Sequence, residues 1–325
     1  MKFEISEAQS FLAEEINKIN LEVEPVELYQ PIRYILDLGG KRMRPVLTLL
    51  GCHLFSNDYS KALYPALAIE VFHNFTLMHD DIMDNAPLRR GNETVHEKWG
   101  NNVAILSGDV MLVKAYELLL ENDVPHMGKM AKLFNRCACE VCEGQQFDMN
   151  FEKIDRISEE DYLNMIRLKT AVLLGLSLQM GAIVGGADDK NADLLREFGV
   201  NLGMGFQLKD DLLDVFGDQS KFGKQVGGDI IANKKTFLLI KALEKATGED
   251  AEQLAHWLAA KDFDNEKKVK AVTKIYNNLE IKYTTELKME LYFSKAFQLI
   301  EQIDTTEDKR SELIAFVEKI INREK

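Results

Sequence analysis

The chain has 325 residues, a formal net charge of −13 at pH 7 and 46% hydrophobic residues. This acidic balance argues against nucleic acid as a partner, because nucleic-acid binding needs a basic surface. The length allows one large domain or two. No linker-like, repetitive or low-complexity segment interrupts the sequence, so we predict a single domain over residues 1–325.

Apolar residues recur at every third or fourth position nearly throughout, as at Leu195, Phe198 and Leu202. This spacing predicts helices, and alternation over strand length is hard to find, so the expected fold class is all-α. All six prolines lie in the first 125 residues, which leaves the remainder suited to long uninterrupted helices. The expected helices cover residues 5–20, 26–37, 42–55, 60–84, 98–121, 126–148, 159–186 and 190–216, with several more from 234 onward.

Two features bear on the compartment. Residues 1–4 already contain an acid and show no signal-peptide pattern. The longest uncharged stretch, residues 170–187, lies at the lower edge of the roughly 20 residues that a spanning helix needs, and it contains polar side chains. We therefore expect a buried central helix, no transmembrane segment and a cytoplasmic location.

One acidic motif occurs twice, as DDIMD at residues 80–84 and DDLLD at residues 210–214. The first and last Asp of each motif share one helix face, where like charges one turn apart destabilise a helix by about 0.2–0.5 kcal/mol. Each motif also lies late in a helix, where the helix dipole disfavours anions. A single copy is equally consistent with a solvated helix end. The repetition favours a metal site, because Mg²⁺ binds proteins through one or two carboxylates plus substrate phosphates.

Basic residues accompany both motifs. A loop expected over residues 85–93 follows the first motif and carries Arg89 and Arg90, and a glycine-rich loop expected over residues 217–233 follows the second. The segment GGKRMR at residues 39–44 places three cations at a helix start, which is a natural anion site. Each cation alone is more commonly a solvated charge. Together they indicate two anion sites, one reached through metal and one contacted directly by cations.

The segments GGKRMRP, DDIMD, LRRG, GQQFD, LKT and GFQLKDD occur in one order along the chain. In this order and spacing the chain resembles the trans-type isoprenyl diphosphate synthases, the family that makes farnesyl and geranylgeranyl diphosphates. The resemblance implies a helical bundle around a deep central cavity, of the isoprenoid synthase type. It also implies a Mg²⁺-dependent transferase of prenyl groups that condenses isopentenyl diphosphate with an allylic diphosphate, and a homodimer.

The resemblance assigns roles residue by residue. The implied Mg²⁺ ligands are Asp80, Asp84 and Asp210, with Asp214 as a further candidate. Asp81 and Asp211 would act through water or hydrogen bonds. The residues implied to contact the allylic diphosphate are Arg89, Lys169, Lys224 and Lys234.

The second substrate has its own implied set. Isopentenyl diphosphate would be bound by Lys41, Arg44, His73 and Arg90. The family accepts His or Gln at the place of His73, so that place needs a hydrogen-bond donor rather than a titrating base. Thr170, Gln207 and Gln145 would face the reacting carbons.

Product length is expected to depend on the helix that carries Asp80. In the family a large residue five positions before the first Asp acts as a floor for the growing chain, and Phe75 occupies that place. Helix geometry alone is equivocal, because Thr76 lies on the Asp80 face and Phe75 lies well round the helix. An ordinary core role for Phe75 is the alternative. One aromatic residue at that place with the small Thr76 beside it resembles the short-chain geranylgeranyl synthases, which implies a C20 product, with C15 as the second choice.

Two other functions share some of these features. A class I terpene cyclase has the same fold and one DDxxD motif, but it lacks a site for isopentenyl diphosphate and has a different second metal motif. A non-catalytic subunit of a heteromeric prenyl synthase typically loses one acidic motif, whereas this chain keeps both. The synthase interpretation therefore accounts for more of the sequence than either alternative.

Overall fold

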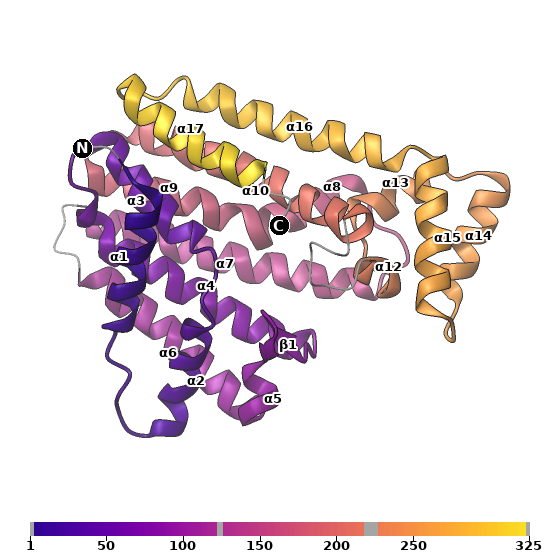
Figure 1. Cartoon of the computed structure of the whole chain (residues 1–325), viewed down its shortest axis with the longest axis horizontal. Coiled ribbons are helices and arrows are strands. Elements are labelled where there is room, and N and C mark those ends of the chain that lie inside the picture. Colours follow the sequence, from indigo (N-terminus) through magenta and orange to yellow (C-terminus); the bar gives the residue numbers. More distant parts are fainter. Residues whose placement is uncertain (1–2, 122–125, 218–226, 323–325) are drawn as a thin grey trace. The chain divides into compact units, whose positions relative to one another are not determined.

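Figure 1 shows the course of the chain in the computed structural model, which describes residues 3–121, 126–217 and 227–322. The chain forms two compact units. Unit 1 comprises Met1–Phe134, Leu176–Arg196 and Ile303–Phe316, and unit 2 comprises Asn135–Gly175, Glu197–Gln302 and Val317–Lys325.

Nearly every described element is a helix, which confirms the all-α class. The elements of unit 1 are α1 (Ile5–Asn17), α2 (Val26–Asp37), α3 (Met43–Phe55), η1 (Tyr59–Ala62), α4 (Leu63–Met83), β1 (Leu88–Arg89), β2 (Asn92–Glu93), α5 (Val95–Trp99) and α6 (Asn101–Leu120). The elements of unit 2 are α8 (Glu159–Ile166), η2 (Arg167–Ala171), α12 (Gly228–Ile231), α13 (Phe237–Lys245), α14 (Gly248–Ala259), α15 (Asn265–Asn278) and α16 (Ile281–Ile300). Four helices contribute residues to both units: α7 (Met127–Glu152), α9 (Val172–Gly185), α10 (Asp189–Phe216) and α17 (Glu307–Ile321).

Three expected helices and one expected loop differ from the elements observed. The helix expected over residues 98–121 is interrupted at Gly100, between α5 and α6, and the described end of the loop expected over residues 217–233 contains α12. The helix expected over residues 60–84 begins as the 3₁₀ turn η1, and α4 starts at Leu63. Pro65 then lies in the first turn of α4, where a helix tolerates proline. The helix expected over residues 159–186 contains the π-helical segment η2 between α8 and α9. π-Helical turns are rare and are frequent at functional sites.

The segment expected as a loop over residues 85–93 contains a small hairpin. Strand β1 pairs with β2 in antiparallel register, with Leu88 opposite Glu93 and Arg89 opposite Asn92. The two turn residues Arg90 and Gly91 have φ angles of 54° and 79°, and two positive φ angles are typical of a two-residue hairpin turn. Strands of two residues are too short to produce visible alternation in a sequence, so the pattern could not predict them.

In unit 1, α4 packs against α3 and α6 (Figure 1). Helix α4 is buried along nearly its whole length, as expected for a helix that is apolar on every side. Gly51 of α3 allows α9 to approach α3 closely, since a Cβ added at Gly51 would lie 2.4 Å from the carbonyl oxygen of Leu178. This packing fixes the helix that ends in the first acidic motif.

In unit 2, two glycines let neighbouring helices approach the π-helical segment. A Cβ added at Gly144 of α7 would lie 2.2 Å from the backbone nitrogen of Lys169, and one at Gly203 of α10 would lie 2.6 Å from the Cα of Ala171. Contacts this short are possible only without a side chain. The backbone around Lys169 and Thr170 is therefore held between α7 and α10.

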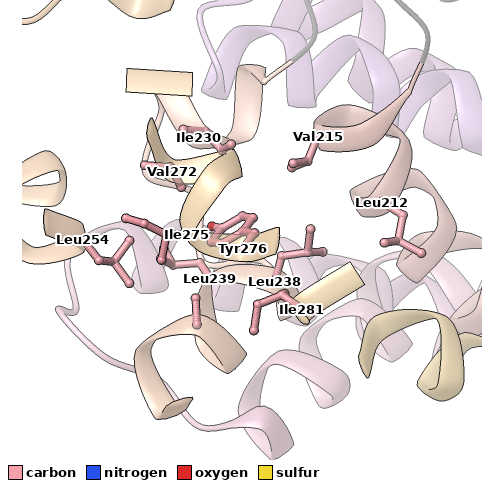
Figure 2. Close-up of a cluster of buried hydrophobic side chains, with 11 residues drawn as sticks. Leu212, Val215, Ile230, Leu238, Leu239, Leu254, Val272, Ile275, Tyr276 and Ile281 are labelled. Carbon is pink, nitrogen blue, oxygen red and sulfur yellow. The ribbon is translucent and has the colours of Figure 1, made fainter. Parts of the chain in front are cut away.

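A second part of unit 2 is held together by the apolar cluster in Figure 2. Its side chains come from α10, α12, α13, α14, α15 and the start of α16 and point toward one another. The cluster consists of Leu212, Val215, Ile230, Leu238, Leu239, Ala242, Leu254, Val272, Ile275, Tyr276 and Ile281. It fixes α12 and α15 relative to the end of α10 that carries the second acidic motif.

Among the described residues, one continuous helical stretch, Glu159–Gly185, is long and apolar enough to cross a membrane. In its most apolar window 78% of the residues are buried inside the protein. Burial of this kind is what the sequence predicts for a core helix.

We expect Gly144→Ala to lower the free energy of unfolding by about 1–3 kcal/mol, because the added methyl group overpacks the contact with the Lys169 backbone. Urea titration followed by circular dichroism measures this change. Gly128→Ala is the matched control on the same helix, since its added Cβ would meet no heavy atom within 4 Å. Equal stability of the two variants would contradict the close approach.

Candidate active site

The first acidic motif lies at the C-terminal end of α4. The amide of Ala86 donates to the carbonyl of Asp81 at 2.9 Å, and the amide of Asn85 donates to the carbonyl of Ile82 at 3.3 Å. With Asn85 at a φ of 48°, this is a Schellman cap, which closes a helix through one left-handed residue. The cap fixes the turn that carries Asp80 and Asp84.

The three acids of this motif have different surroundings. Asp81 is buried and accepts two hydrogen bonds of 2.7 Å from Nε and Nη2 of Arg89. Asp80 is half-buried, and Asp84 is exposed. The hairpin β1–β2 brings Arg89 back onto the end of α4, because the chain reverses at Arg90 and Gly91. Arg89, which was predicted to contact the allylic diphosphate, thus pairs with Asp81 in this structure.

Beside this motif, unit 1 contains a cationic cavity of about 390 Å³. Its lining includes the four residues predicted to bind isopentenyl diphosphate, Lys41, Arg44, His73 and Arg90. Gly40 also lines it at a φ of 131°, and a Cβ there would lie 2.8 Å from the guanidinium carbon of Arg90. The structure therefore gathers residues spread over 50 positions of sequence around one cavity.

His73 is held in one neutral tautomer. Its Nε2 lies 3.1 Å from Nη1 of Arg44, and because a guanidinium can only donate, Nε2 accepts and the ring proton resides on Nδ1. Burial lowers the pKa of His73 well below its usual value, and the charges of Arg44, Arg90 and Arg89 lower it further. The ring is therefore a fixed hydrogen-bond donor and not a titrating base.

The same cavity contains two residues that the sequence reasoning did not assign. Glu70 is buried, and it accepts hydrogen bonds from Arg42 and from Nδ2 of Asn74, the latter at 2.9 Å. Arg42 also donates to the carbonyl of Leu36 and has a left-handed φ of 49°. The pair Arg42–Glu70 thus anchors the segment GGKRMR to α4. Glu70 lies one helical turn before His73, and this spacing in the sequence could have indicated that Glu70 lies on the same helix face as His73.

The second acidic motif lies near the end of α10, in unit 2. Asp210 is exposed, whereas Asp211 is buried and accepts hydrogen bonds from the hydroxyl of Tyr162 and, at 3.1 Å, from Nε2 of Gln207. Thr170 in turn donates to Oε1 of Gln207 at 3.2 Å. The structure therefore joins two predicted residues, Thr170 and Gln207, to the middle acid of this motif.

Burial raises the pKa of Asp211 from 3.8 to about 7. The hydrogen bonds from Tyr162 and Gln207 oppose this rise, and the negative charge of Asp229 adds to it. The sequence reasoning did not assign Tyr162, because nothing in the local sequence links residue 162 to residue 211. The contact depends on how α8 packs against α10.

The predicted lysines of unit 2 have separate positions. Nζ of Lys169 in η2 donates to Oδ2 of Asp148 at 2.6 Å. Asp148 belongs to the segment GQQFD, which was noted in the sequence without a role for its acid. Lys234 is exposed in the turn that follows α12, and Lys224 lies outside the described residues. Gln145 is buried on α7.

Asp214 accepts hydrogen bonds from the N-terminal end of α12. Its Oδ2 accepts from the amide of Asp229 at 3.0 Å, and its carbonyl accepts from the amide of Gly227 at 2.6 Å. The N-terminus of α12 is thereby attached to the end of α10. Any metal bound by Asp214 would share this carboxylate with the Asp229 amide.

Phe75 lies within an aromatic cluster of unit 1. Its ring centroid is 5.6 Å from that of Phe72 and 4.7 Å from that of His79, and Phe72 lies 5.2 Å from Phe134. Phe75 is buried, and Thr76 is half-buried with its hydroxyl bonded to the carbonyl of His73 at 2.8 Å. The cluster holds the Phe75 ring in one orientation.

The acids of the two motifs suit a hard cation that also binds substrate phosphates and water. Among the described residues no group of three or more His, Cys, Asp or Glu side chains forms a complete metal cage. Mg²⁺ needs no such cage, since it is commonly bound through one or two carboxylates together with substrate phosphates and water. Asp80 with Asp84, and Asp210, supply carboxylates of this kind at partly or fully exposed positions.

We predict that stability depends on pH through Asp211. This carboxyl binds its proton more tightly in the folded protein than in the unfolded chain. The proton-bound form is thus favoured on folding, and stability falls as pH rises from the unfolded pKa of 3.8 through the folded pKa of about 7. Relative to Asp211→Asn, the wild type should lose at most about 1.4 kcal/mol per pH unit in this range.

Urea titrations of both proteins at several pH values, with chelator present, measure this difference in the free energy of unfolding. A wild-type stability that stays parallel to that of Asp211→Asn across the whole range would contradict the raised pKa.

The chain matches the family model described as polyprenyl synthetase over residues 25–276. It is 38% identical over 322 residues to a geranylgeranyl pyrophosphate synthase of Geoglobus acetivorans, which covers 98% of either chain. It is 40% identical over 249 residues to a geranylgeranyl diphosphate synthase of Methanosarcina mazei, covering 76% of this chain and 77% of the relative. A crystal structure of a geranylgeranyl pyrophosphate synthase, 43% identical, aligns over 99% of both chains with a TM-score of 0.94. The chain therefore belongs to the polyprenyl synthetase family of prenyltransferases.

Proposed function

We propose that this prenyltransferase condenses isopentenyl diphosphate with an allylic diphosphate and releases a C20 prenyl diphosphate, with C15 as the alternative product. The observation that carries the proposal is the cationic cavity of unit 1, whose lining includes Lys41, Arg44, His73 and Arg90. A terpene cyclase uses no second diphosphate substrate and would have no need of this site. Relatives that are geranylgeranyl diphosphate synthases support the C20 product.

Isopentenyl diphosphate binds in this cavity. The cations of Lys41, Arg44 and Arg90 neutralise its diphosphate, and Nδ1 of His73 donates a hydrogen bond that does not change with pH near neutrality. The ion pair between Arg42 and Glu70 holds the backbone of the site in place. The bound substrate then presents its double bond as the nucleophile.

We assign the allylic diphosphate to Arg89, Lys169, Lys224 and Lys234. Mg²⁺ would be held by Asp80, Asp84 and Asp210, with Asp214 as a further candidate. When bound, Mg²⁺ acts as a Lewis acid that neutralises charge on the diphosphate leaving group. Asp148 limits the motion of the Lys169 ammonium through their 2.6 Å ion pair. Fixed cations of this kind favour charge separation, because they need no reorganisation during the reaction.

The reaction follows from this charge arrangement. The allylic C–O bond breaks, the electron pair leaves with the diphosphate, and an allylic cation remains. The double bond of isopentenyl diphosphate forms the new C–C bond, and the departing diphosphate takes the proton that is lost. Thr170 and Gln207, with Gln145, face the reacting carbons, and the hydrogen bond from Thr170 to Gln207 fixes the direction of their dipoles.

Assembly as a homodimer and a cytoplasmic location complete the proposal. Helix α6 exposes large apolar side chains, a pattern that marks interaction surfaces when such residues adjoin. They are Ile105, Leu106, Val113 and Leu120. We also retain residues 1–325 as one synthase domain, supported by the four helices that contribute to both units.

Purified protein with Mg²⁺, isopentenyl diphosphate and allylic diphosphates of five, ten or fifteen carbons should release inorganic diphosphate and a C20 product. Chromatography of the dephosphorylated products measures their length. Lys41→Gln should raise the KM for isopentenyl diphosphate about 10–100-fold, because a charge-assisted hydrogen bond is worth about 1.5–3 kcal/mol. The exposed Lys132→Gln is the control and should leave both KM values unchanged. Absence of turnover with every allylic substrate would refute the enzyme assignment.

Phe75→Ala should lengthen the main product beyond C20, because it removes the ring that ends the space for the growing chain. Product sizing under saturating isopentenyl diphosphate measures the shift. Phe134→Ala removes a ring of the same cluster that packs on Phe72 and Tyr116, and it controls for general loosening of the core. Unchanged product length in Phe75→Ala, or equal lengthening in both variants, would assign the limit to other residues.

A further inference from the structure

Lys268 of α15 is fully buried, with an exposed fraction of 0%. Lysine is almost never buried to this extent unless its charge is paired. Its Nζ donates to the carbonyl of Ile231 at 3.2 Å and to Oδ1 of Asn233 at 2.7 Å, and it lies 4.1 Å above the ring of Phe263. Burial lowers the pKa of the ammonium. Both hydrogen bonds of this buried ammonium therefore go to one short segment, the C-terminal end of α12.

That segment is closed by a Schellman cap. The amide of Lys234 donates to the carbonyl of Asp229 at 2.9 Å, and the amide of Asn233 donates to that of Ile230 at 3.2 Å, with Asn233 at a φ of 52°. The carbonyl of Gly228 accepts from Ala232 at 3.0 Å. Of the four carbonyls of α12, the remaining one is that of Ile231, and it is the one that Lys268 satisfies.

The other end of α12 is attached to the second acidic motif through Asp214, as described above. Helix α15 supports this end as well, because a Cβ added at Gly227 would lie 2.6 Å from both Cγ atoms of Val269. Figure 2 shows Ile230 and Val272 side by side in the apolar cluster that joins α12 to α15. Two successive residues of α15, Lys268 and Val269, thus support both ends of α12.

We propose that Lys268 is a positioning residue for the allylic diphosphate site. It holds the Asn233–Lys234 turn so that the Lys234 ammonium is presented to the diphosphate. Lys268 itself touches no substrate. This inference rests on the proposed function, since it takes Lys234 as an allylic diphosphate ligand.

Lys268→Met replaces the ammonium by an apolar group of similar length and tests the proposal. The KM for the allylic diphosphate should rise about tenfold, equivalent to about 1.4 kcal/mol, while the KM for isopentenyl diphosphate stays within about twofold. Lys270→Met, on an exposed position of the same helix, should leave both values unchanged. If Lys268 only stabilised the fold, Lys268→Met would raise the KM values of both substrates or lower kcat alone, and the proposal would be wrong.

A double-mutant cycle asks whether Lys268 acts through Lys234. Adding Lys268→Met to Lys234→Met should raise the allylic KM no further, because coupled residues are not additive. Asn233→Gly tolerates the left-handed backbone and removes the side-chain acceptor, so it should raise the allylic KM in the same direction even if Lys268→Met does not fold.

Full additivity in the cycle, or an unchanged allylic KM in both Lys268→Met and Asn233→Gly, would overturn the inference while the wild type remains active. An inactive wild type would instead refute the proposed function, so the two failures are distinguishable.

Discussion

A carboxylate removed from water must find hydrogen-bond donors, and this constraint organises both acidic motifs. In each motif the middle Asp is buried. Asp81 is satisfied by the guanidinium of Arg89, and Asp211 is satisfied by Tyr162 and Gln207. The middle acids thus fix the motifs to the protein, and the flanking acids remain at positions where a cation with its own phosphate and water ligands can reach them.

The same constraint orders the basic residues. Buried Glu70 holds Arg42, and through it the segment that carries Lys41 and Arg44. Asp148 holds Lys169. Each acid pairs with a cation beside the site and fixes its direction before substrate arrives, which reduces the ordering that binding and reaction would otherwise require. Carboxylates that contact no substrate therefore contribute to how the site receives two diphosphates.

The fold class and the candidate site were predictable from the sequence to different extents. Helical periodicity predicted the long helices, and the resemblance of the ordered motifs to a known family singled out four residues that line the cationic cavity: Lys41, Arg44, His73 and Arg90. The partners Tyr162 and Glu70 were not predicted, because they depend on which helix faces meet. The hairpin at Arg89 and the π-helical segment at Lys169 were also missed, since one is too short for a pattern and the other keeps helical periodicity.

In each acidic motif the middle Asp bonds to the protein, and the flanking acids are left to bind metal. A crystal structure with Mg²⁺, isopentenyl diphosphate and an unreactive thio analogue of the allylic diphosphate tests this arrangement most directly. Mg²⁺ should bind to Asp80, Asp84 and Asp210. Asp81 and Asp211 should keep their hydrogen bonds to the protein, and isopentenyl diphosphate should lie in the cationic cavity of unit 1. Metal bound to either middle Asp, or a second diphosphate outside that cavity, would contradict this arrangement.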